Sequence, residues 1–157
     1  MIYVRFIADN SWESRAIRFR TLGTVSHVEY VIDEGDREEY TFGARLRGGI
    51  THRPIRYCTP HFDERYVFLG IEASYETALK FDHRKYDWLD IADLLVGRHP
   101  AFYDPWRLIC STLVGYSNRV AWANGKAPAL INPSVETWRM TPAMLYAACT
   151  QMVRKVQ

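Results

Sequence analysis

Cysteine is scarce in this chain of 157 residues, which holds only three of them: Cys58, Cys110 and Cys149. So small and odd a number does not build a disulfide framework. Long apolar runs are missing too, since none approaches the ~18 residues of a membrane span. A large excess of one charge is also missing, because 20 basic and 18 acidic residues leave a net charge of only +2. That balance gives no electrostatic argument for a nucleic acid partner.

These absences predict a protein of a reducing compartment, and we expect it in the cytoplasm. The N-terminal run carries Arg5 among its apolar residues, which is not typical of a signal peptide. Apolar residues make up 48% of the chain and aromatic residues 14%, a composition that favours a packed core over disorder. The length suits a single domain, so we expect residues 1–157 to fold as one unit.

The order of the predicted elements indicates an α+β fold. Runs rich in Val, Ile, Tyr and Phe predict strands over residues 1–8, 24–33, 39–46 and 65–73. Residues 48–64 begin with two glycines and contain two prolines, so they are predicted to be irregular. Composition and helical spacing of apolar residues predict helices over residues 12–21, 74–85, 87–97, 106–121 and 141–156. Strands therefore crowd the first half and helices the second, which favours an antiparallel sheet packed against helices.

A cysteine and a histidine stand out from this pattern. Cys110 opens the small-residue step Cys-Ser-Thr inside an amphipathic stripe, and His27 lies in a strongly apolar strand-like run. A thiol and an imidazole that meet in the fold make the minimal pair of a thiol hydrolase. Each also has an ordinary interpretation, since free cysteines are often small buried hydrophobes and a histidine can lie on a half-buried strand. A nucleophile gains most at a helix start, so we expect this helix to begin near residues 108–110.

Five stretches follow one another between about residues 25 and 125: SHVEYVI, FGARLRGGITHRP, VFLGI, KYDWLDIADLL and W-x-x-x-CST. In this order they resemble the circularly permuted NlpC/P60-type members of the papain-like thiol hydrolases, in which the histidine precedes the cysteine. The resemblance implies one permuted NlpC/P60-like domain, with the histidine on an antiparallel sheet and the cysteine on a helix. Relatives of this compact form occur in bacteria and their phages, so the resemblance also implies a bacterial or phage protein.

The resemblance assigns roles to particular residues. It implies that Cys110 is the nucleophile, that His27 is its base, and that Tyr86 lies beside the nucleophile. Ser111 stands where many relatives keep the same serine, and we expect it to help bind the substrate. The glutamate that often follows this serine in relatives is Thr112 here.

The third polar residue of the family's site is missing from its usual place. In relatives a glutamate on the strand after the histidine orients the imidazole, and that position is Gly43 here. Residues i and i+2 of a strand share a face, so Glu29 is a candidate to replace it. Asp87 is expected either to cap the next helix or to touch the substrate.

These residues predict acyl transfer by a Cys–His pair, in a cysteine hydrolase that is an amidase or peptidase, or an esterase, and that needs no cofactor. The expected substrate is a small-molecule, peptide or lipid-linked acyl compound, and the sequence does not choose among these. Two alternatives stay open: a catalytically inactive binding module of the same fold, and a lipid acyltransferase. The sequence gives no oligomeric state.

A metal site is not expected. His52, Cys58 and His61 have the spacing H-x5-C-x2-H, which lacks a fourth ligand in a matching pair. A serine hydrolase is not expected either, because neither Ser111 nor Ser134 lies in a GxSxG-type turn.

Overall fold

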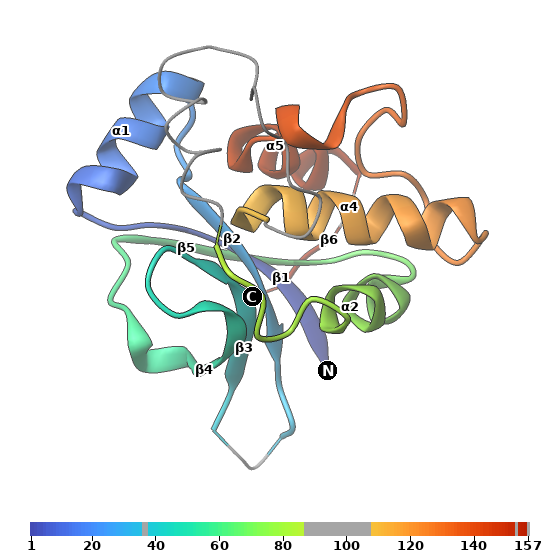
Figure 1. The fold of residues 1–157 in the computed structure, drawn as a ribbon, viewed down its shortest axis with the longest axis horizontal. Helices are drawn as coiled ribbons and strands as arrows, with labels where there is room; N and C mark the ends of the chain where they lie inside the picture. Colours follow the sequence, from blue (N-terminus) through green and yellow to red (C-terminus); the bar gives the residue numbers. More distant parts are fainter. Residues whose placement is uncertain (36–37, 87–107, 153, 157) are drawn as a thin grey trace.

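The computed structural model describes residues 1–35, 38–86, 108–152 and 154–156. Within these residues the chain forms a six-stranded antiparallel sheet and four α-helices, which confirms the α+β class (Figure 1). The strands are β1 (Ile2–Ala8), β2 (His27–Ile32), β3 (Tyr40–Arg45), β4 (Gly49–Pro54), β5 (Phe62–Val67) and β6 (Arg154–Val156). The α-helices are α1 (Trp12–Thr21), α2 (Ile71–Leu79), α4 (Cys110–Ala123) and α5 (Pro142–Met152), and the short 3-10 helices are η1 (Ile55–Tyr57) and η2 (Thr137–Arg139).

The order of the strands determines which element meets the start of α4. The strands lie in the order β4-β3-β2-β1-β5-β6, and β1 pairs with both β2 and β5. One face of the sheet contributes the buried side chains of Phe6, Val28, Tyr30 and Phe42 to the core. Helix α4 packs on β2 and β3 beside α2, and this packing places its first residue, Cys110, at the start of β2.

Several predictions from the sequence are confirmed. The three strands β1, β2 and β3 fall within their predicted ranges, and β2 pairs with β3 as an antiparallel hairpin. Helix α1 covers the predicted range, and the Ser14 amide donates to Ser11 Oγ at 3.2 Å, which is an N-cap bond. Helix α4 begins at Cys110, within the expected range of 108–110.

The prediction of an irregular stretch over residues 48–64 is wrong for residues 49–54 and 62–64, which belong to β4 and β5. Strand β4 lies within it, and Gly48 and Gly49 make the preceding turn with φ values of 93° and 69°. Only Ile50 of this strand is buried, because β4 is at the edge of the sheet. An edge strand also accepts a proline at its end, such as Pro54. The two signals that indicated a loop are therefore properties of an edge strand.

Two other boundaries were misplaced. Strand β5 ends at Val67, before the predicted end at residue 73, because Gly70 turns the chain with a φ of 78° and α2 begins at Ile71. The closing helix ends at Met152, and β6 follows where helix was predicted, paired with β5. That pairing joins segments far apart in the sequence, so a local pattern does not reveal it.

The predicted helix over residues 87–97 lies outside the described residues. Among the helices that the structure describes, none combines the length and the apolar composition needed to cross a bilayer.

Candidate active site

Cys110 is the first residue of α4, the position at which a helix most stabilises a thiolate. Ile109 precedes it as the N-cap residue, and the Ile109 amide donates to the Thr112 hydroxyl at 2.9 Å. The Thr112 hydroxyl in turn donates to the Ile109 carbonyl oxygen, also at 2.9 Å. Thr112 therefore fixes the helix start from the third helical position, as one half of a capping box does. The free amides and the helix dipole at this end favour a thiolate on Cys110.

His27 is the first residue of β2, and its ring meets the Cys110 thiol. The two side chains lie close enough that each raises or lowers the pKa of the other, and the Val28 amide also favours the charged form of the Cys110 sulfur. His27 Nε2 lies 3.2 Å from Glu29 Oε2, which leaves Nδ1 as the ring nitrogen available to the thiol. The structure thus brings together Cys110, His27 and Glu29, which are 83 positions apart at their extremes in the sequence.

The space for Glu29 comes from Gly43 on the neighbouring strand. A Cβ atom at position 43 would lie 2.8 Å from the Cβ of Glu29, closer than real side chains approach. Gly43 is thus the residue whose missing side chain leaves room for Glu29 beside the imidazole. The carboxylate that contacts His27 is that of Glu29, two residues along the same strand and on the same face, as its position in the sequence predicted.

Both oxygens of Glu29 are occupied. Oε2 accepts from Tyr57 Oη at 2.7 Å as well as contacting His27, and Oε1 accepts from Arg5 Nη1 at 3.1 Å. Arg5 lies opposite Glu29 on β1 and also binds the Asp63 carboxylate through Nε at 2.9 Å and Nη2 at 2.6 Å. Arg45 Nη2 lies 3.8 Å from Glu29 Oε2. The buried carboxylate is therefore fixed in position by partners from its own strand and from β1, β3 and η1.

The electrostatics favour an ion pair between the thiol and the imidazole. Burial alone raises the pKa of Cys110, but the His27 charge and hydrogen bond, the Val28 amide and Arg45 outweigh it, so the thiol pKa falls below its ordinary value. Burial and Arg45 lower the pKa of His27, yet Cys110 and Glu29 raise it above its ordinary value. Glu29 is also buried, but His27, Arg45 and Arg5 hold its pKa down. Glu29 thus stays ionised and stabilises a thiolate–imidazolium pair.

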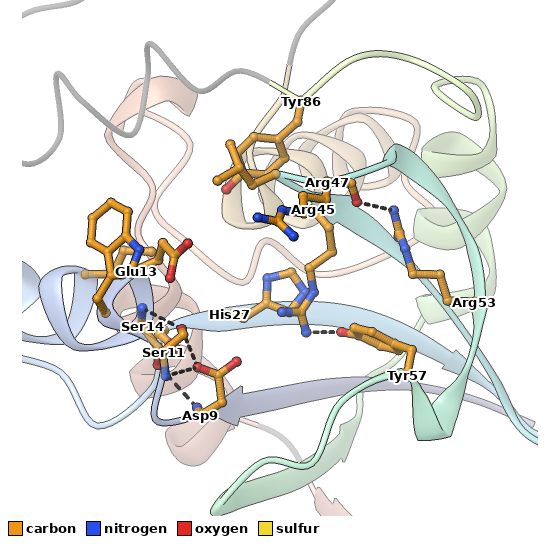
Figure 2. A pocket seen from close by; sticks show the side chains of 14 residues that line it. Asp9, Ser11, Glu13, Ser14, His27, Arg45, Arg47, Arg53, Tyr57 and Tyr86 are labelled. Carbon is orange, nitrogen blue, oxygen red and sulfur yellow. Dashed lines mark hydrogen bonds between the residues drawn. The ribbon is translucent and has the colours of Figure 1, made fainter.

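A cavity of about 470 Å³ opens above the His27 ring (Figure 2). Helix α1 contributes Trp12 and Ile17 to its lining, and the β3–β4 hairpin contributes Arg45 and Leu46. His27 lines this cavity, whereas Cys110 does not and is only 2% exposed. A substrate in the cavity therefore meets the imidazole before it reaches the thiol.

The two residues that were expected to bind substrate, Tyr86 and Ser111, lie in different surroundings. Tyr86 lines the cavity, and its backbone bridges to Leu108, two residues before Cys110, so it lies beside the proposed nucleophile. Ser111 is fully buried, and its hydroxyl donates to the Met140 carbonyl oxygen at 2.7 Å. This placement contradicts the expected contact with substrate, because the hydroxyl already joins α4 to the segment before α5. Asp87 lies outside the described residues.

The residues considered for metal binding have separate partners. His52 Nε2 lies 2.9 Å from Tyr75 Oη, and His61 Nε2 lies 3.3 Å from Arg18 Nη1. Within the part of the chain that the structure describes, no three His, Cys, Asp or Glu side chains form a group that could hold a metal ion.

Sequence reasoning missed three residues of the site, namely Arg5, Arg45 and Tyr57. Arg5 carried a signal, because a charge inside a buried strand needs a partner of opposite charge. Arg45 and Tyr57 carried none, since each becomes part of the site only through its contact with Glu29, which is distant in the sequence.

Comparisons with known proteins give no family for this chain. No family model matches it, and no curated protein matches its sequence.

Proposed function

We propose that the protein is a cysteine hydrolase of the permuted papain-like, NlpC/P60-like type, with Cys110 as nucleophile, His27 as base and Glu29 as the residue that orients His27. The observation that carries the proposal is the placement of the Cys110 thiol, at the start of α4, beside the His27 ring, which in turn contacts the Glu29 carboxylate. A nucleophile, a base and an orienting third group in this order are the parts of nucleophilic acyl transfer.

The chemistry follows from these positions. The Cys110 thiolate attacks the carbonyl carbon, and the new oxyanion accepts from the Cys110 backbone N–H, which has no carbonyl partner within the helix. The His27 imidazolium then gives its proton to the leaving amine or alcohol as the bond to that group breaks. Water attacks the thioester while His27 takes its proton, and the carbon–sulfur bond breaks to release the acid and restore the thiolate.

The cavity lining suits a substrate with an apolar part. Trp12 is 70% exposed and Leu46 is 52% exposed, and both line the cavity beside Ile17. Exposed apolar side chains around a hollow favour apolar groups of a peptide or acyl compound. The three free cysteines suit a reducing compartment, and the proposal places the enzyme in the cytoplasm.

One observation favours a second function, a binding module without catalysis. The Cys110 side chain is 2% exposed and lies off the cavity, as a structural cysteine would. The two proposals differ in the reactivity of the thiol, because a buried structural thiol has its pKa raised and a nucleophile has it lowered.

Alkylation with iodoacetamide near neutral pH distinguishes these two functions. We expect Cys110 to be modified first, since burial raises the pKa of Cys149 to about 12 and is also the main cause that raises the pKa of Cys58. Peptide mapping after brief labelling measures the order, and labelling of the denatured protein provides the control for intrinsic differences. If native Cys110 reacts as slowly as Cys149, the thiol is a core residue and the enzyme proposal is wrong.

A further inference from the structure

Arg45 is held against the candidate site by two side chains. Its guanidinium carbon lies 4.6 Å from the centroid of the Tyr57 ring, and its Nη2 donates to Tyr57 Oη. The same Nη2 lies 3.8 Å from Glu29 Oε2. Figure 2 shows the Arg45 side chain passing the His27 ring to reach Tyr57, and both Arg45 and His27 line the cavity. The side chain is only 20% exposed, so its charge is poorly screened by solvent.

The two other arginines of this cavity are arranged differently. Arg53 donates to the backbone carbonyl oxygens of Gly43, Arg47, Gly49 and Thr51, so its guanidinium stabilises the β3–β4 turn. Arg47 is exposed, and among the described residues its guanidinium makes no hydrogen bond or ion pair. Arg45 is therefore the cavity arginine whose charge is fixed beside the Cys110–His27 pair.

The charges around the pair are nearly balanced. The charged and titratable groups that surround it are Arg5 on β1, Glu29 on β2, Arg45 on β3, Tyr57 and Cys58 at the end of η1, Asp63 on β5, and Asp9, Glu13, Arg47, Arg53 and Tyr86 at the cavity. Two buried or half-buried cations, Arg5 and Arg45, face the carboxylates of Glu29 and Asp63. Loss of Arg45 would leave this group with an excess negative charge, which opposes a further negative charge on Cys110.

We propose that Arg45 is a positioning residue of the thiol site, whose fixed positive charge lets the Cys110 thiolate form at lower pH than the His27 and Glu29 side chains alone would allow. This inference rests on the proposed function and adds to it the residue that sets the working pH range. Arg45 acts through Cys110 and His27, since it lowers the pKa of both groups.

The pH dependence of alkylation tests this inference, with the rate at Cys110 followed by mass spectrometry over the acid and neutral range. Arg45→Gln removes the charge, so we expect the pH at which the alkylation rate rises to increase by about one unit. Below that rise, Cys110 then reacts about tenfold more slowly than in the unchanged protein. Arg45→Lys keeps a positive charge and is expected to restore most of the profile.

Arg47→Gln is the matched control, because it removes one positive charge from the same cavity. Its profile is expected to coincide with that of the unchanged protein, since the Arg47 guanidinium is exposed and held by no described side chain. Tyr57→Phe keeps the ring but removes the hydroxyl that holds Arg45, so the profile is expected to move in the same direction by less. This second variant keeps the test decisive if Arg45→Gln does not fold.

The outcomes separate this inference from the proposed function. If Cys110 of the unchanged protein reacts like an ordinary thiol, the proposed function fails, and the role of Arg45 fails with it. If Cys110 is activated but the Arg45→Gln and Tyr57→Phe profiles coincide with the unchanged one, only the role of Arg45 is overturned. A shift as large in Arg47→Gln as in Arg45→Gln would also overturn it, because the effect would then belong to cavity charge in general.

Discussion

Replacing His27 with glutamine is expected to slow the alkylation of Cys110 at about pH 6 by roughly 100-fold. The imidazolium that stabilises the thiolate is lost, while the burial that opposes it remains. An ordinary thiol with a pKa of about 8.5 is only about 0.3% ionised at about pH 6. The Cys110 thiol of the unchanged protein is more ionised than an ordinary thiol. Its alkylation rate rises by less than its ionisation does, because a stabilised thiolate is a weaker nucleophile.

Rates of alkylation under matched conditions test this prediction, with His52→Gln as the control. His52 lies on β4 and contacts Tyr75, so its replacement is expected to leave the rate at Cys110 unchanged. The alkylation rate of Cys110 in the Glu29→Gln variant is expected to lie between the rates in the His27→Gln and His52→Gln variants. This change keeps a hydrogen-bonding group beside His27 but removes the charge. Equal rates in the His27 and His52 variants would mean that the thiol does not depend on the imidazole.

Replacing Arg5 with methionine is expected to lower the free energy of unfolding by about 3–5 kcal/mol. The Arg5 side chain is 4% exposed and is bound by both Glu29 and Asp63. Methionine has a similar length but leaves the Glu29 carboxylate buried with one counter-charge fewer. The cost is therefore that of removing one partner from a buried ion pair rather than that of a lost surface ion pair.

Urea unfolding near neutral pH measures this loss, and Arg65→Met provides the matched control on the adjacent strand. Arg65 pairs with Glu39 at 2.6 and 3.0 Å, but both side chains are more than one quarter exposed. We expect this control to lose about 1 kcal/mol. If the two variants lose the same stability, the buried group around Glu29 does not contribute as the structure implies.

The fold was predictable where one local pattern decides the structure. The strongly apolar strand around His27 and the helix over residues 12–21 are read directly from their residues. The strands β4 and β6 were not predictable in this way, because both lie at sheet edges and depend on pairing with distant segments. An edge strand buries little, so its sequence carries neither an apolar run nor a clean alternation.

The residues proposed to carry the chemistry of the candidate site were predictable from the sequence, but the residues that hold them in position were not. Cys110 and His27 were identified by residue type and by resemblance, and Glu29 by its position two residues from His27. Their roles remain predictions. Arg45 and Tyr57 were not found, since their contribution depends on distances across the sheet. Ser111 was misjudged because its neighbour in the sequence, Cys110, points to the site while its own hydroxyl is used by Met140.

Trapping of an acyl group on Cys110 tests the central claim most directly. The protein is mixed with p-nitrophenyl acetate near neutral pH, quenched in acid, and digested for peptide mapping, beside the variants Cys110→Ser and His27→Gln. The account predicts a rapid release of nitrophenol and one acetyl group on the peptide that contains Cys110, with neither in the two variants. Acetylation at Cys58 or on lysines alone, at the same rate in all three proteins, would contradict it and leave Cys110 a buried structural thiol.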